Sequence, residues 1–252
     1  MDFRKHSFIY GSFDTKIKGL RFPLVGKSVS KVQMNVIRKI AEDIGDFPNE
    51  RSTVHSLVCE REGFRVLMKF SFQGTDELGR STFISKGIVL TEKDYEKVDC
   101  YPFCLLEPIK ANGESISREV KKGKLAPLTT YLKYSFEGVL DTYNQDKELL
   151  RSLTLAIWLE RQLTLPLGTK FSKLLESVFL LSTIEQRKKI SFVSCKPLRL
   201  KQISVQFKET ANHMDLKIHE DPKLQHQFSD ALAVTMRKNQ AGYRKFLKRK
   251  LT

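Results

Sequence analysis

The chain has 252 residues, of which 40% are hydrophobic and 29% are charged, a balance typical of a globular protein and not of a disordered one. No run approaches the roughly 18 consecutive apolar residues of a membrane-spanning helix, and the opening MDFRKHSF carries charges where a signal peptide would be apolar. The formal net charge is +15, which favours polyanionic partners such as nucleic acid, anionic lipid or an acidic protein. Because the sequence shows neither a long apolar run nor a signal-peptide pattern, we expect a cytoplasmic protein.

The positive charge is unevenly distributed along the chain. Residues 1–110 hold 18 Lys/Arg and 15 Asp/Glu, a net of +3, whereas residues 111–252 hold 26 and 14, a net of +12. We predict a β-rich α+β domain over 1–110 and a basic, mainly helical region over 111–252 with a strand pair near 190–207. A high net charge also keeps protein molecules apart, so solubility is an alternative reason for it.

The first elements are two short apolar runs, at 8–13 and 22–25, which we predict to be strands. Gly26-Lys27-Ser28 lacks the earlier glycine that a phosphate-binding loop requires, so it indicates a turn that leads into a helix capped by Ser28 or Ser30. The apolar residues of this helix recur at helical spacing on one face. They are Val32, Val36, Ile37, Ile40, Ala41 and Ile44.

The central feature of the first half is a hairpin from Lys69 to Leu90. Apolar residues alternate from Arg65 to Phe72, GTDELGR supplies turn formers, and Thr82 to Leu90 resumes as a second apolar strand. We predict that this hairpin is the centre of a largely antiparallel sheet with the preceding helix against one face, an α+β arrangement. Thr91 then indicates the N-cap of a short helix with an acidic first turn.

Residues 107–127 contain Asn-Gly, several serines, a lysine cluster and two prolines, which predict a linker or surface excursion. Apolar residues then recur at helical spacing over 147–163 and 167–181, and Trp158 is expected in the core. Strand candidates follow at 190–194 and 203–207. The chain ends in a predicted helix over 228–251.

No group of residues has the spacing of a known catalytic or metal site. Cys100 and Cys104 would need two further ligands to hold zinc, so we expect buried free thiols. His213, Asp215 and His219 match no standard metal or acid-base arrangement. We therefore predict that the protein is not an enzyme and uses neither a metal nor another cofactor.

Three groups of basic residues are candidates for binding nucleic acid or another polyanion. The group near the C-terminus holds seven cations, more than the helix macrodipole would explain. For the lysines near 121–124, a solvated loop is the alternative interpretation. The candidates are Lys121, Lys122, Lys124, Arg187, Lys188, Lys189, Arg237, Lys238, Arg244, Lys245, Lys248, Arg249 and Lys250.

Three passages resemble the amino-terminal domain of bacterial GTPase-associated adaptor proteins that occur in conflict and immunity gene clusters. They are Phe8-Ile9-Tyr10-Gly11-Ser12 with the later Gly19-Leu20, the central GTDELGRSTFISKGIVL, and LLESVFLLSTIEQRKKISFVS. The resemblance covers about residues 8–90 and 170–195. Lys86 stands where the family tends to have histidine, and the strand after Ser194 lacks the family's usual threonine.

The resemblance implies a non-enzymatic adaptor or regulatory subunit of a multi-protein complex in antiviral defence, with a GTPase or defence effector as its protein partner. It supplies no catalytic residue, and Asp76 and Arg80 would fix the hairpin turn or contact the partner. The alternative function is a nucleic-acid-binding accessory subunit of a guide-directed defence nuclease, similar to an Argonaute partner, in which the basic second half lines a channel.

Overall fold

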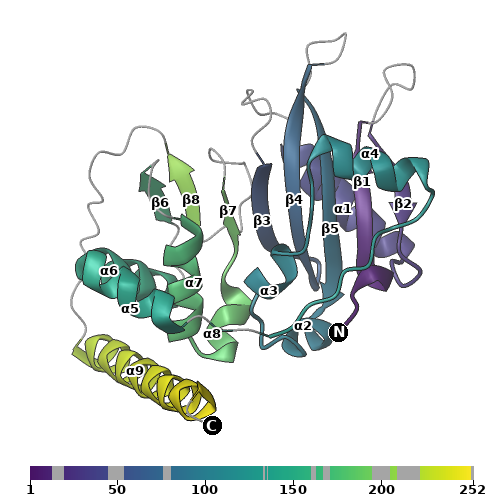
Figure 1. The fold of residues 1–252 in the computed structure, drawn as a ribbon. Helices are drawn as coiled ribbons and strands as arrows, with labels where there is room; N and C mark the ends of the chain where they lie inside the picture. Colours follow the sequence, from purple (N-terminus) through teal and green to yellow (C-terminus); the bar gives the residue numbers. More distant parts are fainter. Residues whose placement is uncertain are drawn as a thin grey trace. The chain divides into compact units, whose positions relative to one another are not determined.

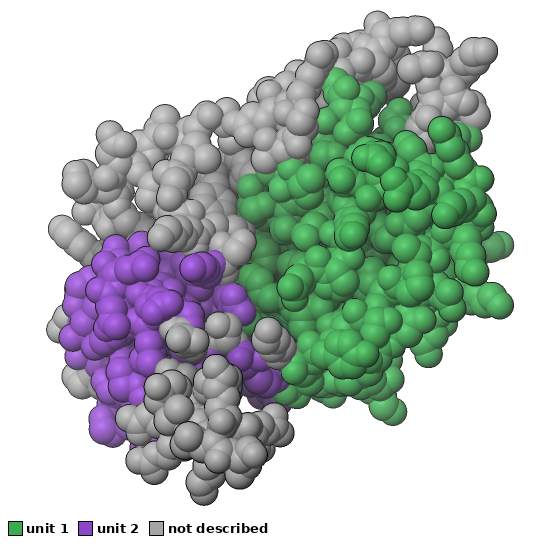
Figure 2. Space-filling model, in the orientation of Figure 1, with its two compact units in different colours: residues 1–132, 190–207 green, residues 133–189, 208–252 purple. Residues whose placement is uncertain are grey.

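The computed structural model shows an α+β protein, as the sequence predicts (Figure 1). The chain divides into two compact units (Figure 2). Unit 1 comprises residues 1–132 and 190–207, and unit 2 comprises residues 133–189 and 208–252. The residues that the structure describes are 1–12, 20–44, 54–75, 81–132, 134, 136–159, 163–166, 171–194, 205–208 and 222–250.

Unit 1 is built on six antiparallel strands in the order β2-β1-β5-β4-β3-β7. A further strand, β8, pairs in parallel with β7 through Phe192 and Val205. The predicted strand pair near 190–207 therefore exists, but it extends the sheet of unit 1. The strands are β1 (Ser7–Gly11), β2 (Arg21–Val25), β3 (Val54–Arg61), β4 (Phe64–Thr75), β5 (Ser81–Thr91), β7 (Phe192–Val193) and β8 (Val205–Lys208).

The hairpin of β4 and β5 lies at the centre of this strand order, as predicted. Phe72 pairs with Phe83 and Leu67 with Ile88, and the register shifts near Gly74. Successive side chains of a strand alternate between the two faces of the sheet, so the register fixes which residues meet which layer of helices. The turn at 76–80, which includes Asp76 and Arg80, lies outside the described residues.

Helix α1 (Lys31–Ile44) covers one face of the sheet (Figure 1). Ser30 begins it as predicted, because its hydroxyl accepts the N–H of Gln33 at 3.2 Å while Gln33 Oε1 accepts the N–H of Ser30 at 2.8 Å. Val32, expected on the apolar face, is instead 57% exposed. The core between helix and sheet includes Val36, Ile37, Ile40, Ala41, Ile44, Phe8, Leu57, Val66, Met68, Phe70, Phe83 and Val89.

Short helices cover the opposite face of the sheet (Figure 1). Thr91 caps the first of them as predicted, its hydroxyl accepting the N–H of Asp94 at 3.2 Å. Residues 107–127, predicted as a linker, include a helix with buried Ile116 and Glu119, and the boundary predicted at residue 110 lies inside unit 1. The helices are α2 (Glu92–Glu96), α3 (Phe103–Leu106) and α4 (Gly113–Lys121).

Unit 2 is mainly helical, and its buried side chains include Leu150, Leu153, Leu174, Val178, Phe228 and Leu232. The helix predicted over 147–163 ends at Trp158, whose half-buried indole N–H donates to the Ser182 hydroxyl at 2.9 Å. Among the described helices, none is both long and apolar enough to cross a membrane. The elements are α5 (Phe136–Gln145), α6 (Lys147–Trp158), β6 (Leu163–Pro166), α7 (Phe171–Leu181), α8 (Ile184–Lys189) and α9 (Pro222–Lys250).

Candidate functional site

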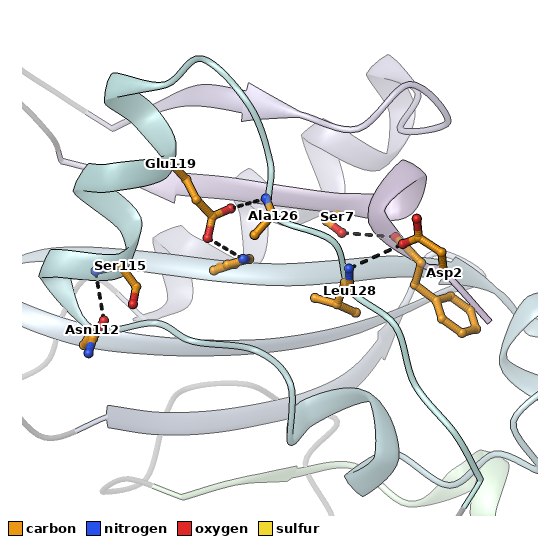
Figure 3. A network of polar contacts seen from close by, with 9 residues as sticks. Asp2, Ser7, Asn112, Ser115, Glu119, Ala126 and Leu128 are labelled. Atoms are coloured by element: carbon orange, nitrogen blue, oxygen red, sulfur yellow. Dashed lines mark hydrogen bonds and ion pairs between the residues drawn. The ribbon is translucent and has the colours of Figure 1, made fainter.

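Two charged groups of unit 1 meet in the layer between β5 and α4. Lys86 is only 2% exposed, and its Nζ lies 2.6 Å from Oε1 of Glu119. The other carboxylate oxygen of Glu119 accepts the N–H of Ala126 at 2.8 Å (Figure 3). Glu119 therefore joins the sheet, α4 and the segment that follows α4.

Local sequence explains how these two residues come together. Alternation along β5 puts Lys86 on the face opposite α1, together with Ile84 and Ile88. Asn112 begins α4, its side-chain oxygen accepting the N–H of Ser115 at 3.0 Å (Figure 3). Both oxygens of Glu119 are occupied by donors, so the group fits a structural role better than proton transfer.

Lys69 lies directly opposite Lys86 in the register of β4 and β5. It is half-buried, and burial lowers the pKa of Lys69 while the nearby Glu107 carboxylate acts to raise it. Like charges directly opposite each other destabilise a strand pair, and Glu119 offsets this repulsion by pairing with Lys86. This buried charge arrangement is absent from the predictions made from the sequence, although a lysine inside the apolar run ISKGIVL is a signal that points to it.

Cys59, Cys100 and Cys104 are buried thiols. Burial raises the pKa of Cys59 to about 12 and that of Cys104 to about 11, which opposes formation of the reactive thiolate. Within the described ranges, no three His, Cys, Asp or Glu side chains gather as a metal site. The cluster of His213, Asp215 and His219 lies outside those ranges.

The first basic group, Lys121, Lys122 and Lys124, is exposed at the C-terminal end of α4. Gly123 follows the helix with φ of 61°, the left-handed conformation that commonly ends a helix. Lysines at this end interact favourably with the negative end of the helix dipole. The dipole of α4 is therefore a sufficient reason for lysines at this position, and no ligand is needed to explain them.

The second basic group lies on α8, and Arg187 and Lys188 make contacts within unit 2. Arg187 Nε donates to the carbonyl oxygen of Phe179 at 2.6 Å and so satisfies a carbonyl in the last turn of α7. Lys188 Nζ lies 3.1 Å from the Glu185 carboxylate. Both side chains are half-buried, and Lys189 is exposed.

The third basic group lies on α9, which has two dissimilar parts. Residues 222–236 contain one Lys and one Asp, and Phe228 and Leu232 are buried there. Residues 237–250 contain seven Lys/Arg and no Asp/Glu. Arg237 and Lys238 are exposed, and the Lys238 ammonium lies 5.6 Å from the centre of the Phe136 ring. The structure describes the helix at Arg244, Lys245, Lys248, Arg249 and Lys250.

The two units carry similar net charges, unlike the two regions expected from the sequence. Unit 1 has 25 Lys/Arg and 17 Asp/Glu, a net of +8, and unit 2 has 19 and 12, a net of +7. The difference arises because residues 111–132 and 190–207, both basic, belong to unit 1. Residues 237–250 alone carry seven positive charges, which equals the whole net charge of unit 2.

These features define a two-unit α+β protein with a strongly basic final helix. In comparisons with known proteins, no family model, curated protein or solved structure matches the chain. The adaptor resemblance, including the roles of Asp76 and Arg80, stays a prediction.

Proposed function

We propose that the chain is a non-enzymatic binding subunit and that it engages a polyanion through the basic part of α9. The observation that supports this is the density of charge: residues 237–250 alone carry +7 of the net +15 of the chain. Such a density raises the local concentration of a polyanion and releases counterions when phosphates or sulfates are neutralised.

The contacts of the other two basic groups make them weaker candidates. Arg187 and Lys188 already bind groups of unit 2, and the lysines after Val120 stabilise the end of α4 through its dipole. The basic part of α9 is different because its seven cations exceed what one helix end requires. Arg237 and Lys238, where this part begins, are exposed to solvent.

The charged groups buried in unit 1 make their contacts within the fold, which favours a structural role for them. Glu119 is shared between Lys86 and the N–H of Ala126. The guanidinium of Arg65 donates to the carbonyl oxygen of Ile190 at 3.1 Å and lies over the Tyr95 ring. Under this proposal unit 1 is the part that binds a protein partner, such as the GTPase or defence effector that the family resemblance implies.

Salt-gradient elution from heparin-agarose tests the polyanion contact. A variant in which Arg237, Lys238, Arg244 and Lys245 are all replaced by Gln is expected to elute at clearly lower salt than the wild type. A matched control replaces four exposed lysines of unit 1 by Gln and should elute close to the wild type: Lys27, Lys31, Lys93 and Lys110. A wild-type chain that passes through the column at low salt, and that also binds neither nucleic acid nor anionic vesicles, would contradict the proposed function.

A further inference from the structure

Six of the seven basic positions in residues 237–250 form two neighbouring rows along one face of the helix, and Lys250 lies outside these rows. Each residue advances the helix by about 100°, so positions 237, 244 and 248 fall in one row and positions 238, 245 and 249 in the next. Position 241, between the two rows, is alanine. We call the six basic positions of these rows, together with Ala241, the basic face of α9. It extends for about 18 Å along the helix.

The buried positions of α9 lie on the other side of the helix. Phe228, Leu232 and Thr235 are 4%, 8% and 3% exposed, and helical spacing puts the centre of this buried side roughly 140° from the centre of the basic face. The exposure of Arg237 and Lys238 agrees with that placement. The helix thus packs in unit 2 through Phe228, Leu232 and Thr235, while Arg237 and Lys238, at the start of the basic part, are exposed.

This arrangement favours nucleic acid over a membrane surface as the polyanion. A helix that lies in a bilayer interface needs a free apolar side to bury among the lipids. In α9, Phe228 and Leu232 pack within unit 2, and the positions that continue this side of the helix in residues 237–250 hold Asn239 and Lys250 beside Tyr243 and Phe246. Phosphates in water need only the cations, and about ten of them lie along 18 Å of a DNA duplex.

We infer that the basic face of α9 binds the sugar-phosphate backbone of nucleic acid without reading base sequence. This inference rests on the proposed function. Arg and Lys bind phosphate oxygens and can also contact guanine in the major groove, whereas Asn and Gln, which pair with adenine, are at positions 239 and 240 outside the basic face, so the absence of sequence preference is the part that the second test below decides. The face itself holds only Arg, Lys and Ala. Contacts to phosphates fix position on the nucleic acid but carry no direct sequence information.

The first test is the salt dependence of binding of the full chain to a fluorescein-labelled 30-base-pair DNA duplex, followed by anisotropy. Log K falls as log salt rises, and each phosphate contact contributes about 0.9 to the steepness of this slope. Arg237→Gln with Lys238→Gln is therefore expected to reduce the magnitude of the slope by about 2. The control pair Lys27→Gln with Lys31→Gln, also exposed, should leave the slope unchanged. Circular dichroism checks that both variants keep the helix content of the wild type. An equal loss of slope in the two pairs would overturn the assignment to α9.

The second test compares duplexes of the same length and composition but unrelated sequence. Affinities within about threefold support backbone binding, and a preference above about tenfold would overturn it, because one good base contact discriminates against the wrong base by about 5- to 150-fold. Binding to phosphatidylserine vesicles without binding to DNA or RNA would overturn the nucleic-acid inference and leave the polyanion function standing. Failure to bind heparin, nucleic acid and vesicles alike would remove the proposed function itself.

Discussion

Lys86 and Glu119 form a buried ion pair that joins the central strand β5 to α4, with Nζ and Oε1 2.6 Å apart. The side chains are 3% and 11% exposed, although 33 residues separate them in the sequence. A buried charge without a partner costs several kcal/mol, so each residue depends on the other. The pair explains why the turn-rich stretch 107–127 is part of unit 1 and not a linker.

Replacing Glu119 by Ala is expected to lower the free energy of unfolding by about 3–5 kcal/mol, because it leaves the Lys86 ammonium buried and unpaired. It also removes the acceptor of the Ala126 N–H. Urea unfolding followed by circular dichroism measures the loss. The matched control is Glu114→Ala on the same helix, where the pair with Arg118 is 64% and 80% exposed and the expected cost is below about 1 kcal/mol.

The double variant Lys86→Met with Glu119→Leu separates loss of the pair from loss of one partner. Apolar replacement of both members of a buried pair is often neutral, so we expect most of the stability to return. Equal losses for Glu119→Ala and Glu114→Ala would show that the buried pair contributes no more than an exposed one.

The sequence predicts the parts of this fold that local chemistry determines. Alternating apolar residues predict the β4–β5 hairpin, and the cap of α1 at Ser30 and that of α2 at Thr91 each need a partner only three residues away. Contacts over long sequence separations determine the rest. β7 joins the sheet of unit 1 partly because Ser56 and Ser194, 138 residues apart, exchange hydrogen bonds. No local pattern in the sequence predicts that these two residues pair.

The same distinction applies to the candidate site. Counting cations in the sequence identifies all three basic groups, but it cannot separate residues that bind the fold from residues that face solvent. Arg187 belongs to the first kind because it donates to a carbonyl of α7, and Arg237 belongs to the second. Lys86 has no partner within its own strand, so only the folded chain brings Glu119 to it.

Gly87 is expected to tolerate no side chain. A Cβ at this position would lie 2.6 Å from the Leu67 carbonyl oxygen, from Met68 Cβ and from Phe8 Cζ, and the oxygen belongs to the neighbouring strand. Gly87→Ala should destabilise the protein by about 1–3 kcal/mol through overpacking, measured as a lower urea midpoint. The control Gly113→Ala meets no atom closer than 3.8 Å and should be neutral or stabilising by up to about 1 kcal/mol.

The thiols of Cys59 and Cys104 are expected to resist alkylation in the folded protein. With pKa values raised to about 12 and about 11 by burial, fewer than roughly one thiol in a thousand is ionised at pH 8, and the solvent has little access. Treatment with iodoacetamide followed by peptide mass spectrometry should show both residues unmodified in buffer and modified in urea. Rapid modification of either one in buffer would contradict its burial.

The pairing of Asp94 with Thr91 and Lys97 makes the stability of the start of α2 depend on pH. Asp94 accepts from Lys97 Nζ at 2.6 Å and from the Thr91 hydroxyl at 2.8 Å, and these bonds, that from Lys97 foremost, lower the pKa of the carboxyl group below its usual 3.8. Because the folded pKa lies below the unfolded one, the stabilisation is complete above about pH 5 and is lost as the pH falls through the folded pKa. Asp94→Asn should therefore cost about 0.5–1 kcal/mol at pH 7 and less near pH 2.5, as measured by urea unfolding at both pH values. Lys97→Met should remove most of this difference between the two pH values, and a cost of Asp94→Asn that stays constant from pH 7 to pH 2.5 would refute the assignment.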